Sequence, residues 1–240
     1  MGEKMEIENL LDQKKVYFDE NLKIWRAKNI MDEESKKEWD EHYTKHNPDT
    51  LFQKFCSIYR RLFISNLVKK YADKFLPENG IIVEAGCGTG ESSAKIPKRN
   101  RTFVAVDISA HPLINHRNPN VDIKLQADIF NLPFKDNSVD AIFNLGVHEH
   151  FTWEENIRIL NEYRRILKPN GVLLLFWPWK YCWVELVSKI KPLFPRSPMM
   201  FGDFDEHKLF NMAGYDLVIN ELSPLDIFIH KVIVCRVKKK

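Results

Sequence analysis

Three glycines at alternate positions, Gly86, Gly88 and Gly90, follow a short apolar run that contains Glu84. Glycine lets the backbone turn tightly and come close to a ligand. A helical pattern begins after the third glycine, at Ser92, and the N-terminus of such a helix would present free N–H groups. The stretch therefore predicts a strand, a ligand-binding turn and a helix, in that order.

Two acidic residues stand at the ends of the next two predicted strands. Asp107 ends the strand over 103–107, where a carboxylate can accept hydrogen bonds from both hydroxyls of a ribose. Asp128 follows the strand over 123–126, and its carboxylate together with the N–H of Ile129 could read an adenine edge. Either aspartate alone could instead cap a helix or form a turn. Taken together, the three strand ends predict one adenosyl-binding site.

The glycine spacing separates two classes of nucleotide ligand. Dinucleotide-binding proteins use G-x-G-x-x-G to cradle a pyrophosphate, and Glu91 stands where that pattern has its last glycine. An acidic side chain would repel a pyrophosphate but would not repel a sulfonium or an ammonium group. The pattern therefore favours S-adenosylmethionine over a nicotinamide dinucleotide.

His148, Glu149 and His150 follow the fourth predicted strand, where a methyl acceptor should arrive. A histidine there could act as a general base, which methyl transfer needs only for a neutral hydroxyl or a protonated amine. We interpret His148 as the candidate base and His150 as a second candidate, and a scaffold role is the alternative for Glu149 and His150. These residues have no third ligand at a suitable spacing, so we predict no metal site.

Short β-branched runs alternate with helical patterns and must position these residues. Alternation of this kind predicts parallel strands joined by crossover helices. A helical stretch over 51–76 comes first, and a capped helix over 205–212 and closing strands over 217–221 and 229–237 come last. The other strand candidates are 81–84, 103–107, 123–126, 141–145 and 172–177.

Two segments lie outside this alternating pattern. Residues 1–50 have apolar positions at helical spacing, and we expect a helical extension whose Trp39, His42 and Tyr43 either cover the ligand or pack as a plain helix. Residues 178–204 mix prolines and tryptophans with lysines. We expect an insertion there that forms a substrate lid or makes a peripheral membrane contact. Residues 51–240, with the insertion at 178–204, are expected to form one domain.

The composition restricts the class of protein. A chain of 240 residues fits one substantial domain, and 36 Lys and Arg against 33 Asp and Glu leave a net charge of +3. This balance gives no electrostatic case for a nucleic-acid partner. The four cysteines are isolated and the N-terminus lacks an apolar secretory signal, so we expect a cytoplasmic protein.

The motifs together resemble those of the class I S-adenosylmethionine-dependent methyltransferases that act mainly on small molecules. The resemblance runs from about residue 51 to 171 and rests on VEAGCGTG, VAVDIS, ADIFNLPFKDNSVD, NLGVHEHF and LKPNG. It implies a Rossmann-like α/β fold with a seven-stranded, mostly parallel sheet in the order 3-2-1-4-5-7-6, helices on both faces and only the seventh strand antiparallel. NLGV stands where amino-directed DNA methyltransferases carry an NPPY-type motif, which also argues against nucleic acid.

The resemblance also assigns residues to the cofactor S-adenosylmethionine, which leaves as S-adenosylhomocysteine. Glu84 and the glycine turn would line its methionine part, and Asp107 would hold its ribose. Asp128 would hold the adenine, and Asn144 would close the floor beside the sulfonium. The full set of expected cofactor-binding residues is Glu84, Gly86, Cys87, Gly88, Gly90, Asp107, Ile108, Asp128, Ile129, Asn144, Leu145 and Gly146.

We therefore expect methyl transfer by in-line displacement to a small-molecule, amphipathic or lipid- or glycan-linked acceptor. The sulfonium methyl is already activated, so the enzyme has mainly to align the acceptor and exclude water. Two other classes stay open. A non-catalytic S-adenosylmethionine-binding module would form no product, and a nicotinamide-dependent oxidoreductase would bind the other cofactor.

Overall fold

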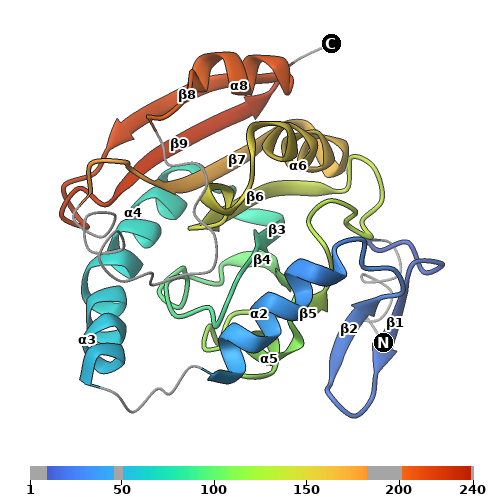
Figure 1. Cartoon of the computed structure of the whole chain (residues 1–240). Helices are drawn as coiled ribbons and strands as arrows, with labels where there is room; N and C mark the ends of the chain where they lie inside the picture. The colour runs from blue at the N-terminus through green and yellow to red at the C-terminus, as the bar shows by residue number, and fades with distance from the viewer. Residues whose placement is uncertain (1–9, 46–50, 183–201, 239–240) are drawn as a thin grey trace.

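Nine strands of the described part of the chain form one sheet in the order β1-β2-β5-β4-β3-β6-β7-β9-β8 (Figure 1). The computed structural model describes residues 10–45, 51–182 and 202–238. The strands are β1 (Val16–Asp19), β2 (Ile24–Ala27), β3 (Asn79–Ala85), β4 (Asn100–Asp107), β5 (Ile123–Gln126), β6 (Val139–Leu145), β7 (Leu167–Pro178), β8 (Tyr215–Leu222) and β9 (His230–Val237).

Seven of these strands form the expected sheet. Their spatial order, β5-β4-β3-β6-β7-β9-β8, is the one that the resemblance implies. The pairs from β5 through β7 are parallel, and β9 is antiparallel to both β7 and β8. The prediction of a Rossmann-like α/β fold is confirmed, although the sheet has two strands more than expected.

The two additional strands correct the prediction of a wholly helical N-terminal extension. Residues 16–27 form an antiparallel β1–β2 hairpin, and β2 adds in parallel to β5. The Asp19 carboxylate accepts hydrogen bonds from the backbone N–H groups of Asn21 and Leu22, which closes the turn. Without the hairpin, β5 would be an open edge strand with unpaired backbone groups, so pairing outweighs the weak helical spacing.

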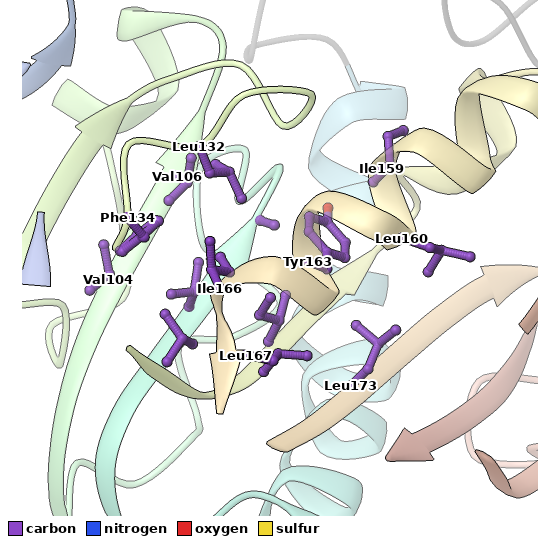
Figure 2. Close-up of a cluster of buried hydrophobic side chains, with 14 of the residues drawn as sticks. Val104, Val106, Leu132, Phe134, Ile159, Leu160, Tyr163, Ile166, Leu167 and Leu173 are labelled. Carbon is purple, nitrogen blue, oxygen red and sulfur yellow. The ribbon is translucent and has the colours of Figure 1, made fainter. Parts of the chain in front are cut away.

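Helices cover both faces of the sheet. One face packs against α6 (Trp153–Ile166), where Tyr163 and Ile166 are fully buried beside β4 and β7 residues (Figure 2). The other face packs against α4 (Ser65–Phe75) through Leu67 and Tyr71. The predicted helix over 51–76 is present, but it consists of α3 (Leu51–Tyr59), a π-helical turn η1 (Arg60–Ile64) and α4.

The helix expected from Ser92 is absent among the described residues. The segment 91–95 forms consecutive turns, and β4 begins soon afterwards at Asn100. Pro97 lies between them, and the residue before a proline is driven out of the helical conformation. Ser93 instead turns inward and is fully buried. The ligand turn after β3 is therefore followed by a tight loop and not by a helix N-terminus.

The C-terminal prediction of a capped helix is confirmed by α8 (Glu206–Met212). The side chain of Asp205 accepts a hydrogen bond from the N–H of Lys208 at 2.9 Å. Most of the expected insertion over 178–204 lies outside the described residues. No helix within the described ranges is both long and apolar enough to span a bilayer.

Candidate active site

The turn after β3 and the end of β4 are joined directly. Gly86 and Gly88 have φ values of +69° and +50°, and a Cβ at Gly86 would lie 2.6 Å from Cγ2 of Val147. The N–H of Gly88 donates a hydrogen bond to Oδ2 of Asp107 at 2.9 Å, and the N–H of Ser109 donates to Oδ1 at 3.0 Å. Two of the predicted motifs therefore meet in one place.

Glu84 is a buried carboxyl group at the start of this turn. Its Oε2 accepts a hydrogen bond from Oγ of Ser93 at 2.6 Å, and Nε2 of His116 lies 4.0 Å away. Burial raises the pKa of Glu84 to about 8 and the pKa of Asp107 to about 6. Burial also lowers the pKa of His116 to about 4, so its ring carries no charge at neutral pH. Among the described residues, no lysine or arginine forms an ion pair with Glu84.

These groups fit S-adenosylmethionine. A buried carboxyl without a cation beside it suits the amino group of the methionine part, because a positive ligand would offset the cost of its ionisation. The N–H groups of Gly86 and Gly90 are bonded within the chain, to the backbone oxygens of Val106 and Cys87. What the left-handed glycines offer a ligand is a backbone without side chains that it can approach closely. Asp107 supplies the carboxylate that ribose hydroxyls require.

Glu91 does not have the role that the sequence suggested. Its Oε1 accepts hydrogen bonds from Oγ of Ser57 and from Nη1 of Arg117, the latter at 2.9 Å. Nη1 of Arg60 lies 3.9 Å from Oε2. The charge of Glu91 is compensated within the chain, so it does not repel a phosphate as the sequence argument assumed. The preference for S-adenosylmethionine therefore depends on the glycine spacing and on Glu84.

Asp128 contacts the N-terminal segment. Its Oδ2 accepts hydrogen bonds from the N–H groups of Met31 and Asp32 at 3.2 and 3.0 Å, and its Oδ1 accepts one from the N–H of Phe130 at 2.9 Å. The carboxylate thus fixes the start of α2 (Glu33–Lys45), and its contact with an adenine stays a prediction. Ile129 is half-buried and packs against the core.

Helix α2 lies beside α5 (Ala110–Ile114), at the edge of the sheet where the cofactor-binding residues are predicted (Figure 1). Oγ of Ser109 donates a hydrogen bond to Oδ1 of Asp40 at 2.5 Å. The rings of Trp39 and His150 meet edge-on at 5.1 Å. A Cβ at Gly88 would lie 3.2 Å from the hydroxyl oxygen of Tyr43. These contacts favour a covering role for the segment, and Asp40 and Ser109 were not foreseen because nothing local in the sequence pairs them.

The remaining cofactor candidates differ in how they face the site. Cys87 is buried within the glycine turn, and the backbone oxygen of Ile108 accepts a hydrogen bond from Nε2 of Gln126 at 3.0 Å. Gly146 has a φ of +67° and lies at the end of β6, after Leu145. Asn144 is buried, and its side chain lies next to Tyr163 on the α6 face. Its contribution to a cofactor site would therefore come from the backbone.

His148 lies in the core rather than on the rim. Its Nδ1 shares a hydrogen bond with Oδ1 of Asn156 at 2.5 Å, and its ring stacks on Trp177 at 5.0 Å. It is 1% exposed, its Nε2 is buried without a partner, and burial lowers its pKa to about 4. This placement favours a scaffold role, and the base role of His148 stays a prediction. His150, under Trp39, lies nearer to the rim.

Comparison with known proteins gives the same assignment. A family model described as a methyltransferase domain matches residues 83–175. A methyltransferase-like protein of Schizosaccharomyces pombe is 32% identical over 150 residues, which are 60% of this chain and 57% of that protein. A tRNA (carboxymethyluridine(34)-5-O)-methyltransferase of Arabidopsis thaliana is 33% identical over 120 residues, which are 49% of this chain and 29% of that enzyme. Both relatives extend well beyond the matched part.

Solved structures show the same fold. The magnesium protoporphyrin IX methyltransferase of Synechocystis, solved with bound S-adenosylhomocysteine, has a TM-score of 0.59 at 17% identity and covers 85% of this chain and 95% of its own. A didemethyltoxoflavin N1-methyltransferase of Burkholderia thailandensis has a TM-score of 0.59 at 14% identity, over 89% and 93% of the two chains. With the family match and the geometry of the glycine turn, the chain carries over residues 83–175 a methyltransferase domain of the class I S-adenosylmethionine-dependent type, whose cofactor is S-adenosylmethionine.

Proposed function

We propose that this protein transfers the methyl group of S-adenosylmethionine by in-line displacement to a small-molecule or lipid- or glycan-linked acceptor. The observation that carries the proposal is the buried Glu84, which has no cationic partner among the described residues and lies beside a left-handed glycine turn held by Asp107. This arrangement supports a ligand that combines a positive charge with a ribose.

Different residues of the chain would bind the cofactor and exclude water. Glu84 would hold the amino group of the cofactor, and Asp107 would hold the ribose hydroxyls. The cofactor itself supplies an activated methyl group, so the protein has to fix its orientation and keep water away. Helix α2, held by the bonds from Ser109 to Asp40 and from the N–H of Asp32 to Asp128, would close this edge against water.

The charge of the chain bears on the acceptor class. The net charge is only +3, which gives no electrostatic support for a phosphate-rich acceptor. Two relatives are named tRNA methyltransferases. The experiment that identifies the acceptor therefore has to distinguish RNA from a small-molecule or lipid- or glycan-linked acceptor. A membrane contact through 178–204 and a cytoplasmic location stay predictions.

The first experiment measures ligand binding. Calorimetry with S-adenosylmethionine, S-adenosylhomocysteine and NAD should show saturable binding of the first two and none of the third. Asp107→Ala serves as the variant with a damaged ribose site. Binding of NAD alone would support the oxidoreductase class and contradict the proposal.

The second experiment identifies the acceptor. The protein is incubated with methyl-labelled S-adenosylmethionine and a cell extract, which is divided into small-molecule, organic-phase and RNA fractions. We expect label in the small-molecule or organic fraction, and mass analysis then identifies the methylated compound. Label that ribonuclease removes would overturn the acceptor class, and cofactor binding with no label in any fraction would indicate a non-catalytic module.

A further inference from the structure

A buried aspartate and histidine form a pair at the start of β9. Nδ1 of His230 lies 2.6 Å from Oδ2 of Asp226, and the same oxygen accepts a hydrogen bond from the backbone N–H of His230 at 3.0 Å. Asp226 is fully buried and His230 is 4% exposed. Because the carboxylate holds Nδ1, the ring orientation is fixed and Nε2 is the nitrogen that can take a proton.

The topology brings this pair to the cofactor-binding edge. β9 is antiparallel to β7, so its first residue, His230, pairs with Pro178 at the carboxyl end of β7. The carboxyl end of β6, with Gly146 and the following 148–150 turn, lies one strand further toward the glycine turn. The histidine therefore lies on the acceptor side of the predicted cofactor site.

The loop that holds Asp226 is strained. Ile227 and Phe228 both have positive φ values, of 58° and 59°, which branched and bulky residues rarely adopt. The hydroxyl of Tyr59, at the end of α3, donates a hydrogen bond to the backbone oxygen of Asp226 at 2.6 Å. Backbone strain that the surroundings enforce is concentrated at functional sites, and here it fixes the carboxylate against the imidazole.

A second carboxyl group lies across from the histidine. Glu149 is buried, one of its oxygens has no hydrogen-bond partner, and Nε2 of His150 lies 3.8 Å from the other oxygen. Burial raises the pKa of Glu149, and both His150 and His230 are close enough to lower it. The other titratable groups that face Asp226 are Tyr59 and Tyr71.

We propose that His230, oriented by Asp226, is the general base of the methyl transfer, and that the acceptor atom carries a proton, as a hydroxyl or an ammonium group does. This inference rests on the proposed function. The acceptor proton moves to Nε2 of His230, as the bond forms for a hydroxyl and before it forms for an ammonium group, and the lone pair of the acceptor oxygen or nitrogen forms the bond to the methyl carbon. The carbon–sulfur bond breaks and its electron pair stays on sulfur as a thioether. The imidazolium, stabilised by the Asp226 carboxylate, then releases its proton to water.

The alternative is that Asp226 only caps the loop, since it also bonds to a backbone N–H four residues later. A capping role and a positioning role differ in what they do to turnover. Loss of a cap lowers stability at every pH, whereas loss of a base changes the dependence of turnover on pH.

The test compares His230→Gln and Asp226→Asn with the exposed control His207→Gln, using the extract fraction that takes up label. His230→Gln should lower kcat by roughly 100-fold and leave the affinity for S-adenosylmethionine within about twofold, because the base does not hold the cofactor. The kcat of the wild type should fall at acidic pH, where a base is protonated, and this fall should disappear in His230→Gln. Asp226→Asn, in which the imidazolium loses its partner, should move that fall to lower pH, and His207→Gln should behave as the wild type.

A measurement without acceptor keeps the inference testable if His230→Gln fails to fold. Proton NMR of the wild type should show a strongly downfield imidazole N–H that Asp226→Asn removes while melting stays cooperative. Unchanged kcat and pH profile in folded His230→Gln, or no such resonance in the wild type, would overturn the assignment. If the wild type itself binds no S-adenosylmethionine or transfers no label, the proposed function fails instead.

Discussion

Gly88 and Asp107 are joined by a hydrogen bond of 2.9 Å from the glycine N–H to the aspartate Oδ2. The bond makes the carboxylate both a structural support of the glycine turn and a candidate ribose acceptor. Its other oxygen is held by the N–H of Ser109 at 3.0 Å. Because both oxygens are oriented by backbone groups, the site is preorganised before a ligand arrives.

Asp107→Ala should weaken the binding of S-adenosylmethionine by about 1–3 kcal/mol, because two ribose hydroxyls would lose a charged acceptor. Calorimetry measures the change. The control is Asp122→Ala, which lies directly before the amino end of β5, whereas Asp107 lies at the carboxyl end of β4. An affinity equal to that of the wild type would show that the ribose is not held by Asp107.

Binding should release a proton through Glu84. The free carboxyl has a pKa of about 8, raised by burial, so it is largely protonated at pH 7. A bound ammonium group would favour the carboxylate, so affinity should rise with pH between about 6 and 8 and level off above. Calorimetry in buffers of different ionisation enthalpy measures the proton count. Glu84→Gln should remove this pH dependence, and an unchanged proton count in that variant would exclude Glu84 as its source.

The raised pKa of Glu84 also affects folding. A carboxyl whose pKa is higher in the folded state than in the unfolded state stabilises the fold at acidic pH. That contribution is complete below the ordinary value of 4.5 and is lost as pH rises toward 8. Denaturant unfolding of the free protein from pH 5 to 8 should show a fall in stability that is smaller in Glu84→Gln. Parallel curves for the two proteins would contradict the assignment.

Asp128 should control the order of helix α2. Asp128→Ala removes the acceptor of the N–H groups of Met31 and Asp32, so α2 amides should exchange faster by roughly 5- to 30-fold, the equivalent of about 1–2 kcal/mol. Asp19→Ala is the matched control, since it removes two backbone bonds from the hairpin turn instead. Exchange of α2 that is equally fast in both variants would show that Asp128 does not anchor the helix.

His148→Ala separates a core role from a catalytic role. The substitution leaves a cavity under Trp177 and an unpaired Asn156 oxygen, so the free energy of unfolding should fall by about 2–4 kcal/mol. His207→Ala, on the exposed side of α8, should cost little. A His148→Ala protein of wild-type stability but with lost turnover would support His148 as the base and not as a core residue.

The sequence predicted the parts of the fold that depend on local pattern. The runs at 81–84 and 103–107 and the cap at Asp205 are each determined by neighbouring residues, and each is present. The β1–β2 hairpin was missed because its pairing with β5 depends on residues about a hundred positions away. The tight loop after the glycine turn was missed because Pro97 outweighs the helical spacing.

In the candidate site, too, the features that depend on local sequence could be predicted and those that depend on distant residues could not. Gly86, Gly88 and Asp107 could be predicted because each follows a strand at one edge of a parallel sheet. The bonds from Ser109 to Asp40 and from His230 to Asp226 could not, since the first joins two elements far apart in sequence and the second needs a left-handed loop at Ile227. The role of Glu91 was misjudged because its partners Ser57 and Arg117 come from distant segments.

A crystal structure with S-adenosylhomocysteine is the most direct test of the central claim, that the glycine turn, Glu84 and Asp107 hold one adenosyl amino acid. The account predicts the amino group against Glu84, the ribose hydroxyls on the Asp107 carboxylate and the adenine beside Asp128, with α2 ordered over them. Ligand density elsewhere on the chain, or a ligand whose ribose avoids Asp107, would contradict it.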